Sequence, residues 1–74
     1  MLVVKAPLLT DKVCGVLDGY EQDGVTIRLV NRKGMELEFE MTGKSGFDAV
    51  GLAKEIVRSY DFGNALYFSV MWRD

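Results

Sequence analysis

The stretch VTIRLVNRKGMELEFEM, residues 25–41, consists of two runs of alternating apolar and polar residues separated by a turn at Asn31 to Gly34. Alternation with a period of two is the pattern of a β-strand that buries one face. The turn is typical of a three-residue hairpin loop in which glycine takes the left-handed conformation. That loop predicts a register in which aliphatic and charged residues separate onto opposite faces: Leu29 opposite Leu37, Ile27 opposite Phe39 and Arg28 opposite Glu38.

The same turn pattern occurs just before this stretch, at Glu21 to Gly24. It predicts a further strand on the N-terminal side, with Leu17 opposite Leu29 and Asp18 opposite Arg28. Two hairpins in succession make an antiparallel three-stranded β-meander. Its core face would carry Leu17, Leu29 and Leu37, and its opposite face would carry Asp18, Arg28 and Glu38, with Glu36 and Glu40 on the same side.

A helix is expected after the meander. Ser45 is a candidate N-cap, and Asp48 three residues later completes a capping-box-like pair. Apolar residues then recur at spacings of three and four, which is the pattern of one buried helical stripe. The stripe comprises Ala49, Leu52, Ala53, Ile56 and Tyr60, widened by Phe47, Val50 and Val57.

A final strand is expected over residues 65–72, where Leu66, Phe68, Val70 and Trp72 form one apolar side. Residues 2–5 could add a short N-terminal edge strand, which Pro7 would end. The fold class predicted is therefore α+β: an antiparallel three-stranded β-meander, then one α-helix packed on one sheet face, then a C-terminal strand. Its length of 74 residues predicts a single small domain over 1–74.

Composition limits the classes of protein that the chain can represent. The formal net charge is −2, whereas a nucleic-acid-binding domain of this size usually has a basic excess. No signal peptide and no membrane span of about 20 apolar residues is recognisable, and the single Cys14 forms no disulfide within one chain. We therefore expect a cytoplasmic protein. A small core without cross-links also favours self-association.

No catalytic or metal-binding constellation is recognisable in the sequence. The chain has no histidine and one cysteine, which excludes histidine-based catalytic triads and a structural zinc site within one chain. We expect no enzyme activity, no metal, no cofactor and no small-molecule substrate. The motif Thr42-Gly43-Lys44-Ser45 lies where a phosphate-binding loop would lie. Such a loop also requires a glycine five residues before Gly43, and that position is occupied by Glu38. It is interpreted as a loop glycine followed by a helix cap, with a weak anion site at Gly43 to Ser45 as the alternative.

The candidate binding surface is the meander face opposite the leucines. The predicted register pairs Val16 with Val30 and places Cys14 and Tyr20 on either side, and one helix cannot cover both faces of a sheet. The N-terminal residues or the last strand could cover this patch, or it could be a surface for self-association or for a protein partner. The predicted partner-binding residues are Val16, Tyr20 and Val30, with Glu36 and Glu38 as a polar rim.

Two functions follow as hypotheses. The first is a non-enzymatic, self-associating protein-interaction module, of the size of an accessory or inhibitory protein from a phage or mobile element. The alternative is a nucleic-acid-associated factor that stacks bases on Trp72 and Tyr67 beside Arg58 and Arg73, although the absence of a basic excess makes nucleic acid the weaker choice.

Overall fold

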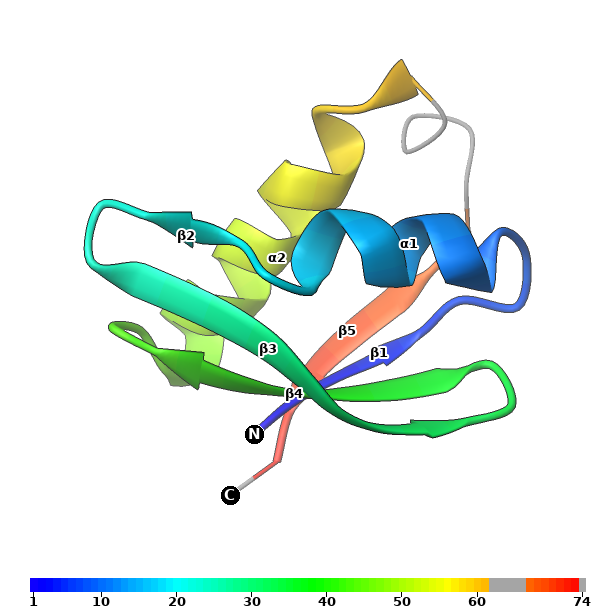
Figure 1. Cartoon of the computed structure of the whole chain (residues 1–74), viewed down its shortest axis with the longest axis horizontal. Helices are drawn as coiled ribbons and strands as arrows, with labels where there is room; N and C mark the ends of the chain where they lie inside the picture. The colour runs from blue at the N-terminus through cyan, green and yellow to red at the C-terminus, as the bar shows by residue number, and fades with distance from the viewer. Residues whose placement is uncertain (62–66, 74) are drawn as a thin grey trace.

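The fold is a five-stranded antiparallel sheet with two helices, seen in a computed structural model that describes residues 1–61 and 67–73 (Figure 1). This confirms the predicted α+β class, with a meander followed by a helix and a C-terminal strand. In chain order the elements are β1 (Leu2–Lys5), α1 (Thr10–Leu17), β2 (Glu21–Gln22), β3 (Val25–Lys33), β4 (Glu36–Thr42), α2 (Gly46–Arg58) and β5 (Ser69–Trp72).

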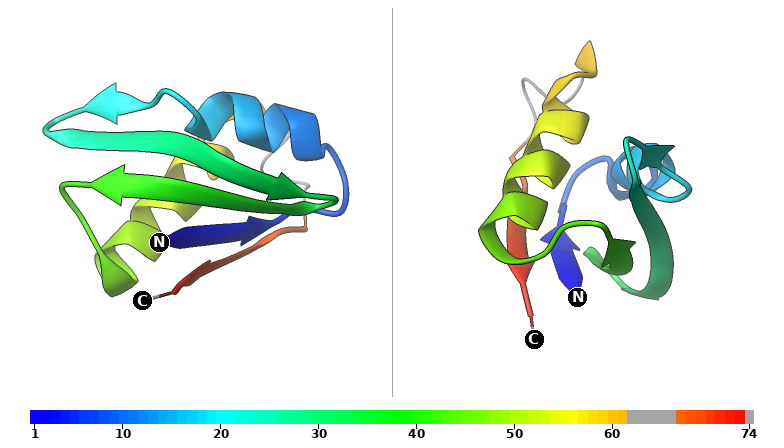
Figure 2. Two further views of the ribbon diagram at one scale, coloured as in Figure 1. Left: turned by 60° about the horizontal axis from the view of Figure 1, so that its bottom comes forward. Right: turned by 90° about the vertical axis from the view of Figure 1, so that its left-hand side faces the viewer.

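The strands lie side by side in the order β2-β3-β4-β1-β5. The sequence suggested that the N-terminal strand β1 lies at an edge of the sheet. That is wrong, because β1 lies between β4 and β5 and pairs with both. Leu2 and Val4 are fully buried, which an inner strand explains better than an edge strand does. The edges of the sheet are β2 and β5, at opposite ends of the layer (Figure 2).

Both helices pack on the same face of the sheet, so the molecule has two layers (Figures 1 and 2). Between the layers lies one apolar core, to which α1 contributes Val13 and Leu17, and α2 contributes Ala49, Ala53, Ile56 and Val57. The opposite face of the sheet has no helix over it among the described residues. Val3 lies on that open face between Glu38 and Met71 in the strand register, and its exposed fraction is 1%.

Residues 10–17 form helix α1, so the prediction of a long first strand through Leu17 is wrong. The apolar residues Val13, Val16, Leu17 and Tyr20 recur at i, i+3, i+4 and i+7, which is a helical pattern. Asp11 in the first turn also favours a helix start, because a carboxylate stabilises the positive end of the helix dipole. The strand alternation of Cys14, Val16 and Asp18 competes with that pattern over the same residues, and burial of Val13 and Leu17 on one helical side decides between the two.

The first hairpin is shorter and tighter than predicted. Glu21 pairs with Thr26 and Gln22 with Val25, so only Asp23 and Gly24 form the loop. Both loop residues have positive φ, 54° and 80°, as a two-residue type I′ turn requires. The right-handed twist of paired strands favours this turn over the three-residue loop that the sequence suggested. Leu17 therefore does not lie opposite Leu29.

The second hairpin also closes with a two-residue loop, Gly34-Met35, and Lys33 pairs with Glu36. The register is consequently shifted from the prediction: Leu29 lies opposite Phe39 rather than Leu37, and Arg28 lies opposite Glu40 rather than Glu38. A β-bulge at Val30 changes the register again, since Leu29 pairs with Phe39 and Asn31 with Glu38. After the bulge Arg32 lies opposite the buried Leu37, and its guanidinium contacts Asp11 of α1 at 2.6 Å.

Helix α2 begins after Ser45, which occupies the N-cap position as predicted, although its side chain makes no capping hydrogen bond. The loop before it is held by a close backbone approach. Gly43 has φ +93°, and a Cβ there would overlap the carbonyl oxygen of Gly24 and lie 3.1 Å from the Cα of Val25. The glycine in the Thr42–Ser45 motif thus has a packing role in the fold. Thr26 and Thr42 join the two strands beside it through their hydroxyl groups.

Candidate functional site

The predicted apolar patch does not exist as one surface. Val16 lies on α1 and Tyr20 in the connection to β2, and both are half-buried against the core cluster. Val30 is the bulged residue of β3 and is 44% exposed. The predicted pairing of Val16 with Val30 is wrong, because it required a strand where α1 lies. Of the alternatives left open, the N-terminal residues do supply core, since Leu2 and Val4 pack inside, but Leu8 and Leu9 remain exposed.

Glu36 and Glu38 lie on the open face of the sheet, where the strand alternation placed them, together with Glu40. Arg73, beyond β5, contacts both carboxylates: its Nη1 donates to Glu38 at 2.6 Å and its Nη2 to Glu36 at 3.3 Å. The amide of Asn31 donates to the other oxygen of Glu38 at 2.9 Å. The Asn31 hydrogen bond and the nearby Arg73 charge lower the pKa of Glu38 below its ordinary value. Arg73 therefore offsets part of the negative charge of Glu36 and Glu38 within the molecule.

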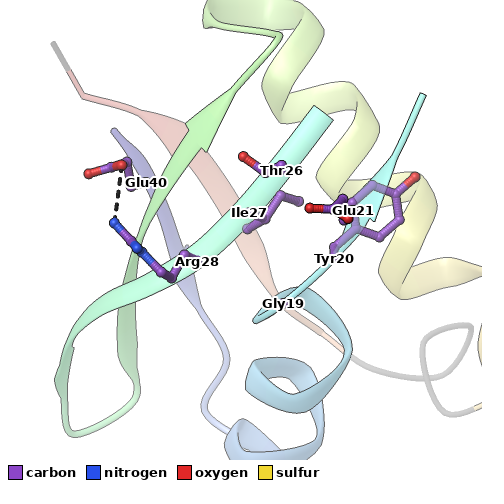
Figure 3. Close-up of a pocket in the computed structure, with 7 residues that line it drawn as sticks. All are labelled: Gly19, Tyr20, Glu21, Thr26, Ile27, Arg28 and Glu40. Atoms are coloured by element: carbon purple, nitrogen blue, oxygen red, sulfur yellow. Dashed lines mark hydrogen bonds and ion pairs between the residues drawn. The ribbon is translucent and has the colours of Figure 1, made fainter. Parts of the chain in front are cut away.

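A shallow hollow of about 290 Å³ lies over β3, between Tyr20 on one side and Glu40 on the other (Figure 3). Arg28 and Glu40 form an ion pair at 3.4 Å on one side of the hollow (Figure 3), and both side chains are mostly exposed. The hydroxyl of Tyr20 donates to Gln22 at 3.2 Å, and Glu21 and Thr26 complete the polar lining. An exposed pair of this kind is worth about 0–1 kcal/mol, and the lining holds no nucleophile beside a base. The hollow offers polar groups for weak contacts but no catalytic arrangement.

A larger groove, of about 480 Å³, runs between α2 and the edge strand β5. Its walls are mostly apolar: Phe47 and Val50 from α2 face Val70, Met71 and Trp72 from β5, with Lys54 at the rim. Phe47 was predicted to widen the buried stripe of the helix. It is instead 97% exposed, the most exposed large apolar side chain of the described residues. An aromatic ring left in water beside an apolar groove is typical of a contact surface.

The strand that borders this groove has an open outer edge. Among the residues that the structure describes, β5 pairs only with β1. Edge strands in soluble proteins usually carry charges, prolines or bulges, or are very short, which prevents pairing with other chains. The opposite edge, β2, has two residues, one of them Glu21. Residues 67–72, YFSVMW, contain neither a charge nor a proline.

The predicted alternation of the last strand is confirmed where it can be seen. Phe68, Val70 and Trp72 are half-buried against the core, whereas Ser69 and Met71 are exposed on the open face. Ala65 and Leu66, with which the prediction began, lie outside the described residues. The guanidinium of Arg58 lies over the ring of Phe68, 5.9 Å from its centroid.

The aromatic residues of the nucleic-acid hypothesis do not form one platform. Trp72 packs toward the core, whereas Tyr67 is 78% exposed. Arg73 contacts Glu36 and Glu38, and Arg58 lies over Phe68. The structure therefore does not bring these aromatics and arginines into a basic groove of the kind that binds single strands.

Cys14 is half-buried in α1, and burial, with a smaller effect of the Asp18 charge, raises the pKa of its thiol. Within residues 1–61 and 67–73, no three potential metal-ligating side chains come together. The helices in that same part of the chain are too short or too polar to cross a membrane. Comparison of the chain with protein-family models, with curated proteins and with solved structures gave no match.

Sequence reasoning missed Phe47 and the β5 edge as a joint surface. The position of Phe47 carried one usable signal: it comes before Ala49, the first core residue of the helix, and so lies in the first turn outside the packed part. The open edge of β5 could not be inferred from the sequence, because the strand order depends on β1 entering the sheet between β4 and β5.

Proposed function

We propose that this protein is a non-enzymatic protein-interaction module that associates with a second copy of itself through the surface formed by α2 and β5. The observation that carries the proposal is the exposed Phe47 ring next to an apolar groove at the edge strand β5, which pairs only with β1 among the described residues. Buried apolar area is the main source of affinity in protein association, and exposed aromatic anchors supply the largest share of it per residue. An accessory or inhibitory role fits a chain with these features.

The residues proposed earlier as a polar rim, Glu36 and Glu38, lie on the open sheet face, to which β5 contributes Ser69 and Met71. They are a border of the α2–β5 surface in this proposal, with Arg73 between them and β5. Val16, Tyr20 and Val30 have no part in the contact, because two of them support the core and the third is at the bulge.

Sedimentation velocity of the full chain from about 1 µM to 1 mM tests the proposal. We expect a concentration-dependent shift from monomer to dimer, and Phe47→Ser should move the midpoint at least tenfold higher in concentration. The matched control is Met35→Ser, which removes an exposed apolar side chain from the β3–β4 turn. A monomer at 1 mM, or equal effects of the two substitutions, would contradict the proposal.

A further inference from the structure

The backbone of β5 fixes how a second strand can pair with it. The N–H of Arg73 donates to the carbonyl of Met1 at 2.8 Å, and the Met1 ammonium donates to the Arg73 carbonyl at 2.6 Å. In an antiparallel ladder, such hydrogen-bonded pairs alternate with pairs that are not hydrogen-bonded. Given the β1–β5 register, Met71 and Ser69 therefore direct their backbone groups toward β1, and Val70 directs its N–H and C=O away from β1.

A two-fold symmetric contact between two β5 strands must pair the residues whose backbone groups point away from β1. An antiparallel pair centred on Val70 does so, because Val70 of one copy and Val70 of the other then form a hydrogen-bonded pair. The same register places Phe68 opposite Trp72 of the second copy on the helix side, and Ser69 opposite Met71 on the open side. We infer that the protein dimerises by this edge-to-edge pairing of β5, with Val70 on the two-fold axis. The inference rests on the proposed function and adds the register to it.

The side chains are complementary to themselves in this register. Phe68 and Trp72 come together twice, and an aromatic pair of this kind contributes about 0.5–1.5 kcal/mol beyond the area it buries. Tyr67 lies opposite Arg73 of the second copy, which places a cation beside an electron-rich ring. Because residues 67–72 carry no charge, no like charges oppose each other along the ladder.

The helices add to the contact. Phe47 of α2 lies beside Trp72 in the groove, whereas Arg58, at the other end of the helix, lies over Phe68. Helix α2 thus runs antiparallel to β5, and the two-fold axis brings Phe47 of one copy toward Arg58 and Phe68 of the other. Gly51 lies midway along this helix, and a Cβ at that position would contact no other part of the chain. A glycine there lowers helix stability without any benefit inside one copy, but it leaves room for a neighbouring chain.

The area available approaches what a specific dimer needs. Covering one aromatic side chain removes about 150–250 Å² from water. Phe47 and Tyr67, at 97% and 78% exposure, amount to four rings in the dimer and hence roughly 500–900 Å². Met71, which is half exposed, and the paired backbones bring the total toward the lower bound of about 1,200 Å² for specific interfaces.

Disulfide cross-linking between introduced cysteines tests the proposed register directly. The Ser69–Met71 pair across the axis is not hydrogen-bonded, so its Cα atoms should lie about 4.5 Å apart, within the range of a disulfide. Ser69→Cys and Met71→Cys chains are made separately, each with Cys14→Ala, and oxidised alone and as an equimolar mixture. We expect covalent dimers at least tenfold more abundant in the mixture than in either single sample. Cross-linking of Met71→Cys with itself would place Met71 on the axis and overturn the inference.

Proline at position 70 provides a test that leaves the monomer intact. Val70→Pro removes the outward-directed N–H at an edge strand, where proline is tolerated, and Val70→Ala keeps that N–H although it removes two methyl groups. We expect Val70→Pro to weaken dimerisation at least tenfold more than Val70→Ala, with an unchanged circular dichroism spectrum for both. A wild-type dimer that survives Val70→Pro, or that fails to cross-link at positions 69 and 71, overturns this register and leaves self-association standing. A wild-type chain that is monomeric at 1 mM overturns the proposed function itself.

Discussion

The carboxylate of Asp18 accepts a hydrogen bond from the backbone N–H of Leu29 at 2.9 Å. Strand β2 pairs only with Val25 and Thr26, so Leu29 lies on a part of β3 that has no partner strand on that side. The residue that follows α1 thus completes the hydrogen bonding of the sheet edge with its side chain. Asp18 joins the end of the helix to the middle of the longest strand.

Asp18→Ala is expected to destabilise the fold by about 0.5–1.5 kcal/mol, the usual value of one hydrogen bond, and to increase the exchange rate of the Leu29 amide. Asp18→Asn keeps an oxygen acceptor and should cost less. Urea unfolding and amide hydrogen exchange measured by NMR check both effects. Unchanged protection of Leu29 in the alanine variant would show that the hydrogen bond does not hold this strand.

Gly43→Ala is expected to destabilise the protein by about 2–4 kcal/mol, because a Cβ would overlap the backbone at Gly24 and because φ is positive. Gly34→Ala is the matched control, since Gly34 also has positive φ but open space around its Cα. That substitution should cost only about 1–2 kcal/mol, from the left-handed conformation alone. Thermal and urea unfolding of the two variants measure the difference, and equal losses would show that the close approach is unimportant.

The pKa of Glu38 predicts a pH dependence of stability. Asn31 and Arg73 favour the charged carboxylate, so the pKa is lower in the folded than in the unfolded chain. The folded state therefore binds this proton more weakly, and its contribution is present above the ordinary glutamate pKa and is lost as pH falls through the folded value, from about pH 5 downward. Glu38→Gln should flatten the stability curve there, and so should Asn31→Ala, which removes the main cause. A curve as steep as that of the wild type in both variants would contradict this assignment.

Cys14 is expected to react slowly with thiol reagents. Burial in α1 and the charge of Asp18 raise the pKa of the thiol, which leaves less of the reactive thiolate at neutral pH. At pH 8 the folded chain should react with an aromatic disulfide reagent at least tenfold more slowly than the chain in urea. Similar rates in the two conditions would mean that α1 opens readily.

The sequence predicts those parts of the fold that depend on local pattern. The β3–β4 hairpin, the start of α2 at Ser45 and the alternation of Phe68, Val70 and Trp72 all follow from periodicity and turn residues. Their register does not follow, because a four-residue segment such as Asn31 to Gly34 is compatible with more than one loop length. The bulge at Val30 shifts the pairing between Leu29 and Asn31, and no local pattern in these residues encodes it.

Helix α1 and the surface formed by α2 and β5 were not predicted, for related reasons. Residues 13–20 fit both a helical and a strand period, and the valines and Gly15 weaken the helical choice when only propensity is considered. A strand through these residues would give Val16, Tyr20 and Val30 a common face, which the molecule does not have because α1 occupies residues 10–17. The open edge of β5 depends in turn on a strand order set by contacts between the two ends of the chain.

The unequal ends of the sheet limit how large any assembly can become. At one end lie the two residues of β2, one of them Glu21, and the part of β3 beyond them, which carries Arg28, Arg32 and Lys33, whereas at the other end β5 carries no charge. A chain with only one sheet edge that can pair binds one other copy, and the dimer then has no free pairing edge for a third copy. If copies associate through β5, as proposed, the charges at the far edge oppose strand-by-strand growth into a fibre, the usual hazard of an uncharged edge.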